Sequence, residues 1–164
     1  MARRKQAEAV RLEELDLGYL ALFVGMRMNE LVLEQVHAAG FQGLRNSHGF
    51  VFQHLLGGPR SVSELAALLD VTQQAASKTV AELERLGFIE DTASDDARVR
   101  RVCLSSHGMA AVEKGRAVRA ELQKRLERSH GSQAVEATRK VLADVLSSLG
   151  GAEVVRSRKL RQPR

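Results

Sequence analysis

The stretch from Ser61 to Gly108 constrains the fold of this chain more than any other part of its sequence. Its hydrophobic periodicity predicts two short amphipathic helices separated by a tight turn, followed by two strands that flank a polar loop. Ser61 and Glu64 have the spacing of a capping box, in which the serine side chain accepts a hydrogen bond from a free backbone N–H and the glutamate reaches back. The first helix is therefore expected to begin directly after Ser61.

The second helix of this unit, predicted over residues 73–86, has two different faces. Its apolar residues are spaced by three and four, which places them on one side: Ala76, Val80, Leu83 and Leu86. The other side, near the expected N-cap, carries polar and basic residues: Thr72, Gln73, Gln74, Ser77 and Lys78. Such side chains can hydrogen-bond to base edges, and a helix N-terminus attracts phosphate. The alternative is that this face is merely solvated.

Two strands are predicted after this helix, over residues 88–90 and 99–104, with a polar loop over residues 91–97 between them. The order helix, turn, helix and β-wing is typical of a winged helix-turn-helix. In that module the second helix enters the major groove of DNA, while the wing contacts the backbone or the minor groove. The sequence therefore predicts a DNA-binding module over residues 44–108.

From the end of the loop onward, the chain resembles the MarR family of bacterial regulators, named for multiple antibiotic resistance. The residues that carry the resemblance are Asp96-Ala97-Arg98 and Leu104-Ser105-Ser106-His107-Gly108. The family pattern is Asp-x-Arg, a strand, and Leu-Thr-x-x-Gly, so Ser105 replaces the usual threonine while keeping a helix-capping hydroxyl.

The resemblance implies that Arg98 reaches the minor groove and that Asp96 holds its guanidinium in place. A narrow minor groove concentrates negative potential, which suits a planar cation with several donors. Arg100 is expected to contact phosphate or solvent and ranks below Arg98. The alternative is that Asp96 and Arg98 form a surface ion pair of little energetic value.

Long helices are predicted on both sides of this module, over residues 8–40 and 109–150. The first is apolar on two sides and the last carries a broad apolar stripe, so both need additional packing partners. The resemblance implies that these helices form a two-fold dimer, which would address an inverted repeat in DNA; a closed monomeric bundle is the alternative. The predicted fold class is therefore mainly α with a small β-wing, a winged helix-turn-helix flanked by N- and C-terminal dimerisation helices. We expect one MarR-like domain over residues 1–150 and a basic tail over residues 151–164.

Composition narrows the class of protein. A chain of 164 residues with 44% hydrophobic and 27% charged residues is typical of one soluble domain. No apolar run is long enough to span a membrane, the first residues lack the apolar core of a signal peptide, and the single cysteine excludes an intrachain disulfide. These features predict a cytoplasmic protein without a membrane partner. The net charge of +5 is concentrated at the ends, because residues 1–10 carry +2 and residues 150–164 carry +4.

Other chemistry is sparse in the sequence. Cys103 alternates with Val102 and Leu104 and is expected to fill space rather than to sense oxidants, which would require a lowered pKa and access. The five histidines are not paired at a spacing of three or four, so no metal site and no cofactor are expected. We find no phosphate-binding glycine loop and no nucleophile with a partner, and therefore expect no enzymatic activity.

The resemblance also implies a pocket for a small aromatic or anionic ligand between the dimerisation helices and the winged module. The residues expected near it are Tyr19, Arg27, Arg45, His48 and Phe52. A cationic or imidazole donor beside an aromatic wall can hold a phenolate or a carboxylate. The alternative is that the aromatic residues are ordinary core and that the charged residues are ordinary surface.

These features together predict a homodimeric, sequence-specific regulator of transcription. It is expected to bind an inverted-repeat operator in double-stranded DNA, as a repressor rather than an activator, and the resemblance adds release by a small ligand. Two alternatives remain open at this point. One is a winged-helix module that binds another protein, and the other is a nonspecific architectural DNA binder that depends on the basic ends.

Overall fold

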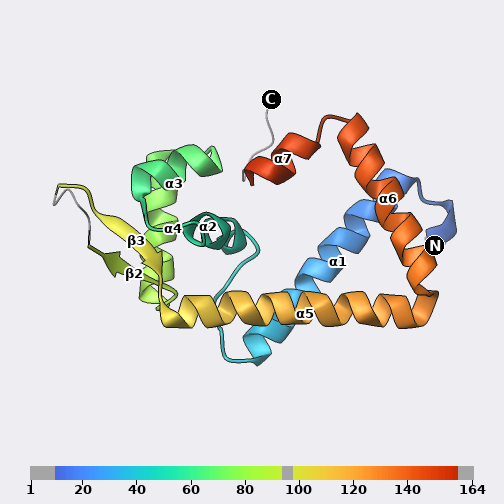
Figure 1. The fold of residues 1–164 in the computed structure, drawn as a ribbon, viewed down its shortest axis with the longest axis horizontal. Helices are drawn as coiled ribbons and strands as arrows, with labels where there is room; N and C mark the ends of the chain where they lie inside the picture. The colour runs from blue at the N-terminus through green and yellow to red at the C-terminus, as the bar shows by residue number, and fades with distance from the viewer. Residues whose placement is uncertain (1–9, 94–97, 159–164) are drawn as a thin grey trace, which may run out of the picture.

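The structure, a computed structural model, describes residues 10–93 and 98–158 (Figure 1). Its helices are η1 (Leu12–Glu14, a 3-10 turn), α1 (Leu17–Ala38), α2 (His48–Leu55), α3 (Val62–Leu69), α4 (Gln73–Arg85), α5 (Ser106–His130), α6 (Ser132–Ser148) and α7 (Ala152–Ser157). Its strands are β1 (Arg60–Ser61), β2 (Ile89–Thr92) and β3 (Arg101–Leu104), which form an antiparallel sheet in the order β1-β3-β2. The predicted fold class, mainly α with a small β-wing, is confirmed.

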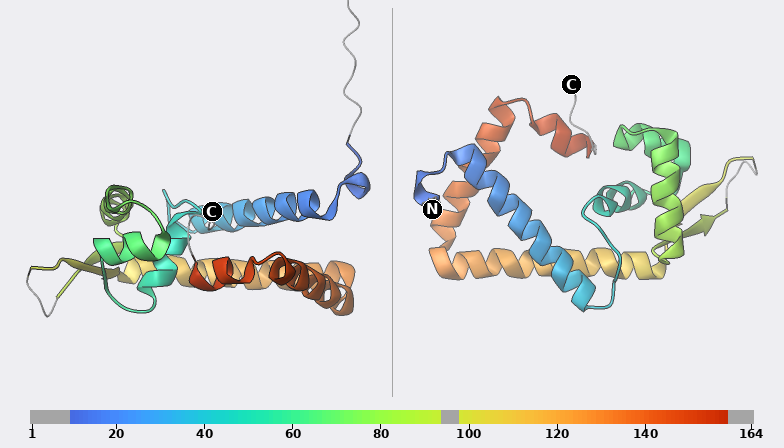
Figure 2. Two further views of the ribbon diagram at one scale, coloured as in Figure 1. Left: turned by 90° about the horizontal axis from the view of Figure 1, so that it is seen from above. Right: turned by 180° about the vertical axis from the view of Figure 1, so that it is seen from behind.

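The long helices extend from a compact winged module. Figure 1 shows α2, α3, α4 and the hairpin of β2 and β3 gathered at one end of α5, while α6 rises from the other end. Helix α1 crosses α5, and the view from above in Figure 2 shows that α1 lies in a different layer from α5, α6 and α7. The module and the long helices are therefore joined mainly through α5 and its crossing with α1.

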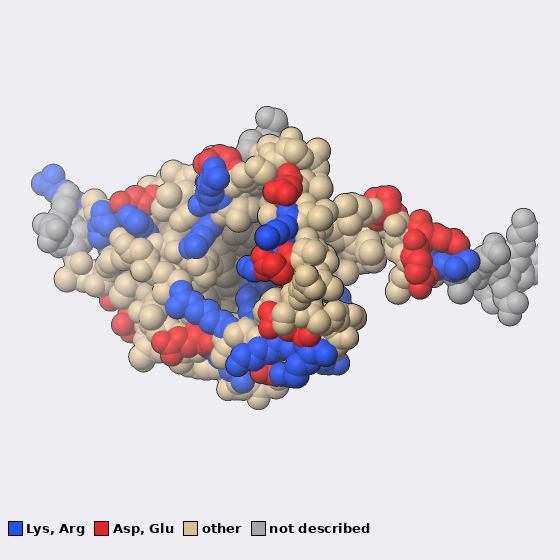
Figure 3. All heavy atoms as spheres, turned by 45° about the vertical axis from the view of Figure 1, so that its right-hand side comes forward, with Lys and Arg blue, Asp and Glu red and all other residues tan. Residues whose placement is uncertain are grey.

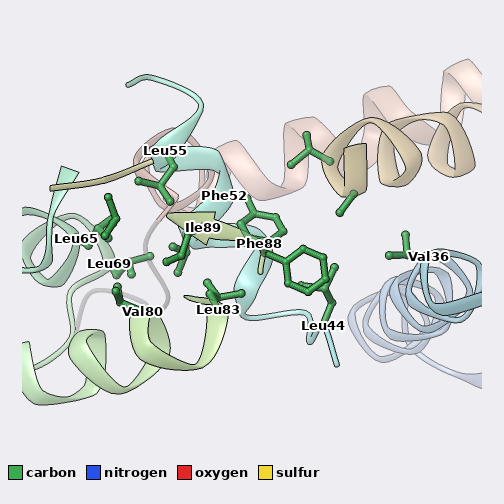
Figure 4. Packing of buried hydrophobic residues seen from close by; sticks show 14 of the residues in the cluster. Val36, Leu44, Phe52, Leu55, Leu65, Leu69, Val80, Leu83, Phe88 and Ile89 are labelled. Atoms are coloured by element: carbon green, nitrogen blue, oxygen red, sulfur yellow. The ribbon is translucent and has the colours of Figure 1, made fainter. Parts of the chain in front are cut away.

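The hydrophobic core is centred in the winged module and extends to Val32 and Val36 of α1 and to Ala111 and Val112 of α5. Its largest fully buried side chains are Phe88, Leu65, Leu69, Leu83, His48, Val51, Val80 and Val102. Phe88 packs against Phe52 of α2 with ring centroids 6.0 Å apart, and Figure 4 shows both rings beside the buried leucines and valines. Burying one such side chain stabilises the fold by about 1.5–3 kcal/mol. By contrast, α6 has no buried residue.

Short polar side chains fix where the helices of the module begin. The capping box is confirmed: Ser61 Oγ accepts from the Glu64 N–H at 3.2 Å, and Glu64 Oε2 accepts from the Ser61 N–H at 2.6 Å. Thr72 Oγ1 accepts from the Ala75 N–H at 3.2 Å and starts α4. Each cap satisfies a backbone donor that the helix leaves free.

Some boundaries differ from the sequence prediction. Strand β1 was not predicted, because two residues are too few to show alternation, and its pairing with β3 depends on the fold. The first helix of the module, α2, begins at His48, after a turn in which the His48 N–H donates to the Arg45 carbonyl. The return strand begins at Arg101 and not at residue 99.

The segment expected to be a basic tail contains the short helix α7. Its last turn contacts the winged module: Arg158 Nη1 donates to Gln53 Oε1 at 2.7 Å, and the Arg158 carbonyl lies 3.3 Å from His54 Nε2. Because α7 has six residues, it shows too little periodicity to be predicted from sequence.

Candidate nucleic-acid interface

Helix α4 turns one face to the core and leaves the other open. Ala76, Val80 and Leu83 are buried against α3 and the sheet. The predicted contact residues are all exposed: Thr72, Gln73, Gln74, Ser77 and Lys78. The polar face predicted from the sequence is therefore accessible to an external partner along the N-terminal half of α4.

The two glutamines of this face differ in their contacts. Gln73 Nε2 donates to Ser63 Oγ of α3 at 3.2 Å, so its amide links the two helices of the helix-turn-helix. Within residues 10–93 and 98–158, Gln74, Ser77 and Lys78 make no side-chain hydrogen bond or ion pair. Gln74 thus keeps its donors and acceptors available, whereas those of Gln73 are partly used inside the protein.

Arg85 belongs to the same exposed face, although the sequence analysis did not single it out. Gln74, Lys78, the exposed Ala81 and Arg85 follow one another at intervals of four, three and four residues. This is the spacing of residues on one side of a helix. In the part of the chain that the structure describes, the Arg85 side chain has no ion pair. The spacing of three and four residues along the predicted helix was the signal that could have revealed it.

The wing carries three arginines near the start of β3, and they have different surroundings. Arg98 lies in an exposed turn before the strand, and Asp96, its predicted partner, lies outside the described residues. Arg100 Nε lies 2.7 Å from Asp91 Oδ1, and Arg100 Nη2 also bonds to Glu84 Oε1 of α4. The hydrogen bond to Asp91, followed by the charge of Glu84, raises the pKa of Arg100 above its usual value.

A cavity of about 210 Å³ lies between α1, the start of α2 and α5. Its apolar wall contains Val32, Leu33, Val36, Leu44, Phe52 and Val112. Its polar groups come from Arg45, Asn46, His48, Gln53, Arg116 and Arg119. Figure 3 shows Lys and Arg side chains around a hollow on one face of the molecule. A wall of this composition suits a ligand with an apolar body and a negative group.

Three of the five residues predicted near a ligand line this cavity, namely Arg45, His48 and Phe52. Tyr19 is exposed and packs against Phe23, with ring centroids 5.3 Å apart. Arg27 forms ion pairs with two glutamates of its own helix. Both lie outside the lining, because the cavity meets α1 near its C-terminal end, and Tyr19 is about 20 Å further along a helix that rises 1.5 Å per residue.

Arg116 and Arg119 of α5, which were not predicted from the sequence, also line the cavity. Together with Val112 they recur at intervals of four and three residues, so they share one face of the helix. Arg119 Nη2 donates to Asn29 Oδ1 at 2.9 Å. Arg116 makes no side-chain hydrogen bond or ion pair with any described residue.

The cavity wall is connected to α4 through a buried histidine. His48 is 1% exposed, and its Nδ1 accepts from the Arg45 N–H at 3.3 Å. Burial, together with the nearby charge of Arg45, lowers the pKa of His48. Arg45 forms an ion pair with Glu82 of α4, and His48 Nε2 lies 3.7 Å from the same carboxylate. A change in the position of Arg45 would therefore break or move its ion pair with Glu82 and so affect α4.

Other features of the described residues add no site. Cys103 is half-buried and is not in a disulfide. No group of three or more histidine, cysteine, aspartate or glutamate side chains within residues 10–93 and 98–158 could hold a metal ion. None of the described helices has the length and hydropathy needed to cross a membrane.

Residues 42–98 match the sequence pattern of the MarR family. This range contains α2, β1, α3, α4 and β2. Over this segment the chain is similar to the MarR family. The resemblance inferred from the residues between Asp96 and Gly108 is thereby confirmed. A comparison with curated protein sequences gave no match.

Several solved structures share the fold over most of the chain. YusO from Bacillus subtilis is 24% identical, with a TM-score of 0.65, and the match covers 80% of this chain and 91% of YusO. A point mutant of MepR from Staphylococcus aureus, bound to an oligodeoxyribonucleotide, is 21% identical with a TM-score of 0.62, covering 83% of this chain and 99% of MepR. A probable transcriptional regulator from Pseudomonas aeruginosa is 26% identical with a TM-score of 0.57, covering 82% and 99%. The MarR fold therefore includes the long helices as well as the winged module.

Proposed function

We propose that this protein is a MarR-type, sequence-specific regulator of transcription that binds double-stranded DNA. The observation that carries the proposal is the open face of α4, on which Gln74, Lys78 and Arg85 form one exposed stripe beside the wing. An amide can pair with base edges, and cationic groups can contact phosphates or guanine. The MepR structure with a bound oligodeoxyribonucleotide supports DNA as the class of partner.

The exposed apolar faces of the long helices support a homodimer. On α6 the exposed large apolar residues are Val141, Leu142, Val145, Leu146 and Leu149, and on α1 they are Leu17, Tyr19, Leu22, Phe23, Val24 and Met26. Contiguous apolar surface of this kind marks an interface. A second copy would bring α1 and α6 of both chains together around a two-fold axis and would set two α4 helices against an inverted repeat.

The dimer can be tested by placing a charge on this face. We expect Val145→Asp to raise the dissociation constant of the dimer at least about tenfold, because an unpaired charge buried at a two-fold interface is introduced twice. Ser147→Asp adds the same charge on the opposite side of α6 and should leave the dimer intact. Sedimentation equilibrium measures both. A Val145→Asp protein that stays as dimeric as wild type would contradict this interface.

We further propose that the regulator acts as a repressor in the cytoplasm. A dimer bound to its operator excludes other proteins from the same DNA by occupancy alone, so repression requires no additional contact surface. Activation would require a surface that recruits another protein to DNA. Measuring transcription from an operator-containing promoter with and without the protein distinguishes these roles by the sign of the change.

Selection from a randomised pool of double-stranded DNA at several salt concentrations tests the function itself. We expect an inverted repeat, with affinity that falls steeply as salt rises. The Gln74→Ala variant should select a different repeat. The Gln73→Ala variant should lose affinity for all DNA sequences equally, since Gln73 bonds to Ser63 within the protein. Retention without a motif would instead indicate an architectural binder. If the folded, dimeric protein retains no DNA, the alternative of a winged-helix module that binds another protein is favoured.

We propose in addition that the cavity binds a small aromatic or aliphatic carboxylate, which releases the protein from DNA. The apolar wall would hold the body of the ligand, and Arg116, which has no ion pair among the described residues, would hold its negative group. A carboxylate that also draws Arg45 away from Glu82 would disturb α4. We expect benzoate or salicylate to dissociate the operator complex of wild type and to be at least about tenfold less effective with Arg116→Gln. An equal effect on both proteins would contradict the site.

A further inference from the structure

We propose that Arg100 and Arg101 are positioning residues that hold the wing to the two helices of the helix-turn-helix, one arginine to each helix. Arg100 was expected from the sequence to contact phosphate or solvent, but the geometry points to this different role. The inference rests on the proposed function for its effect on DNA binding, whereas the contacts themselves exist in the protein without DNA.

Arg100 connects the wing to α4. Its Nε lies 2.7 Å from Asp91 Oδ1 of β2, and its Nη2 bonds to Glu84 Oε1 near the end of α4. A guanidinium in contact with two carboxylates belongs to a cluster with a net negative charge. Such a cluster repels phosphate, so its arrangement suits the joining of two elements better than the binding of DNA.

Arg101 connects the same strand to α3. Its Nη1 donates to the Pro59 carbonyl at 3.0 Å, and its Nη2 lies 3.2 Å from Glu64 Oε1. Glu64 also accepts from the backbone N–H of Ser61, so Arg101 reaches the capping box of α3. The Ser61 bond, assisted by Arg101, lowers the pKa of Glu64 and keeps it ionised.

Adjacent residues of an extended chain point to opposite sides, so neighbouring arginines at this position can reach different helices. Arg101 is the first residue of β3 and pairs with Thr92, the last residue of β2, and Arg100 precedes it directly. The two side-chain links therefore lie where the backbone pairing of the described strands stops. Figure 1 shows the hairpin of β2 and β3 leading away from α4.

The position of the links determines their consequence for DNA. At its base the hairpin belongs to a three-stranded sheet, because Arg101 and Val102 also pair with Ser61 and Arg60 of β1, but no pairing of the described strands extends beyond Arg101 and Thr92. A two-stranded arm that leaves a sheet twists easily. Arg98 lies two residues before Arg100, on the arm that leaves the sheet. Arg100 and Arg101 hold the base of this arm to α4 and α3. These contacts therefore set the direction of Arg98 relative to the exposed face of α4.

The test compares three matched neutralisations: Arg98→Gln, Arg100→Gln and Arg101→Gln. In the free protein, we expect faster hydrogen exchange in residues 89–104 for Arg100→Gln and Arg101→Gln, but not for Arg98→Gln. On operator DNA, Arg100→Gln and Arg101→Gln should weaken binding about fivefold, the scale of one exposed ion pair, with an unchanged salt slope. Arg98→Gln should lower the slope by about one.

Neutralising the carboxylate partners separates positioning from phosphate binding. The double variant Glu84→Gln with Asp91→Asn should speed exchange in the hairpin and weaken operator binding, although it removes negative charge from the DNA-facing side. If Arg100 contacted phosphate, the same double variant would strengthen binding and Arg100→Gln would lower the salt slope; either result would overturn the proposal. If the wild-type protein does not bind DNA at all, the proposed function is wrong. If hydrogen exchange in the hairpin is the same in every variant as in wild type, the proposed positioning role of Arg100 and Arg101 is wrong, whatever the DNA-binding result.

Discussion

Replacing Gly108 with alanine is expected to reduce the free energy of unfolding by about 2–3 kcal/mol or more. A Cβ atom at this position would lie 2.0 Å from the Phe88 carbonyl oxygen and 3.0 Å from its carbonyl carbon, both of which are backbone atoms. That oxygen accepts from the Ser105 N–H at 3.1 Å, and the Phe88 side chain is 1% exposed, so the strand cannot move away without losing a hydrogen bond and core packing. Urea denaturation at one protein concentration measures the loss.

Gly115→Ala provides the matched control on the same helix. The nearest atom to its added Cβ is Val36 Cγ2 at 4.0 Å, an ordinary contact. In a helix interior alanine is favoured over glycine by about 0.5–1 kcal/mol, so this variant should be more stable than wild type. Equal destabilisation by both substitutions would mean that α5 is sensitive to any change, and the close approach at Gly108 would then not be the cause.

Arg98→Ala is expected to weaken operator binding about tenfold or more, within the roughly 1–3 kcal/mol that an arginine contact to a DNA groove contributes. The free energy of unfolding should change little, because residue 98 lies in an exposed turn outside the core. Fluorescence anisotropy with labelled operator, repeated at several salt concentrations, measures both the affinity and its salt slope.

Arg11→Ala removes the same charge far from the wing and serves as the control. Arg11 is exposed, pairs only locally with Glu14, and lies just before η1 at the other end of the molecule. We expect its operator affinity to remain within about twofold of wild type, because exposed charges beyond a Debye length of about 10 Å are largely screened. Equal losses in the two variants would show that binding follows total charge rather than a placed arginine.

The sequence by itself determined the winged module and the beginnings of its helices. Ser61 with Glu64 predicted the start of α3, and the buried positions of α4 followed from spacings of three and four. Gly108 was visible as part of a family motif. Such features can be predicted because caps and hydrophobic periodicity depend on residues within one or two turns of each other.

Only the tertiary structure decided which polar side chains already form hydrogen bonds or ion pairs within the protein. Gln73 bonds to Ser63 on the neighbouring helix, and Arg100 bonds to Glu84 sixteen positions earlier in the chain. The cavity likewise joins Arg116 of α5 to Arg45 before α2, and leaves Tyr19 outside. These contacts depend on how α1, α4 and α5 cross and on where the hairpin leaves the sheet. Local sequence patterns carry no information on those distances, because they arise from packing between segments that are far apart in the chain.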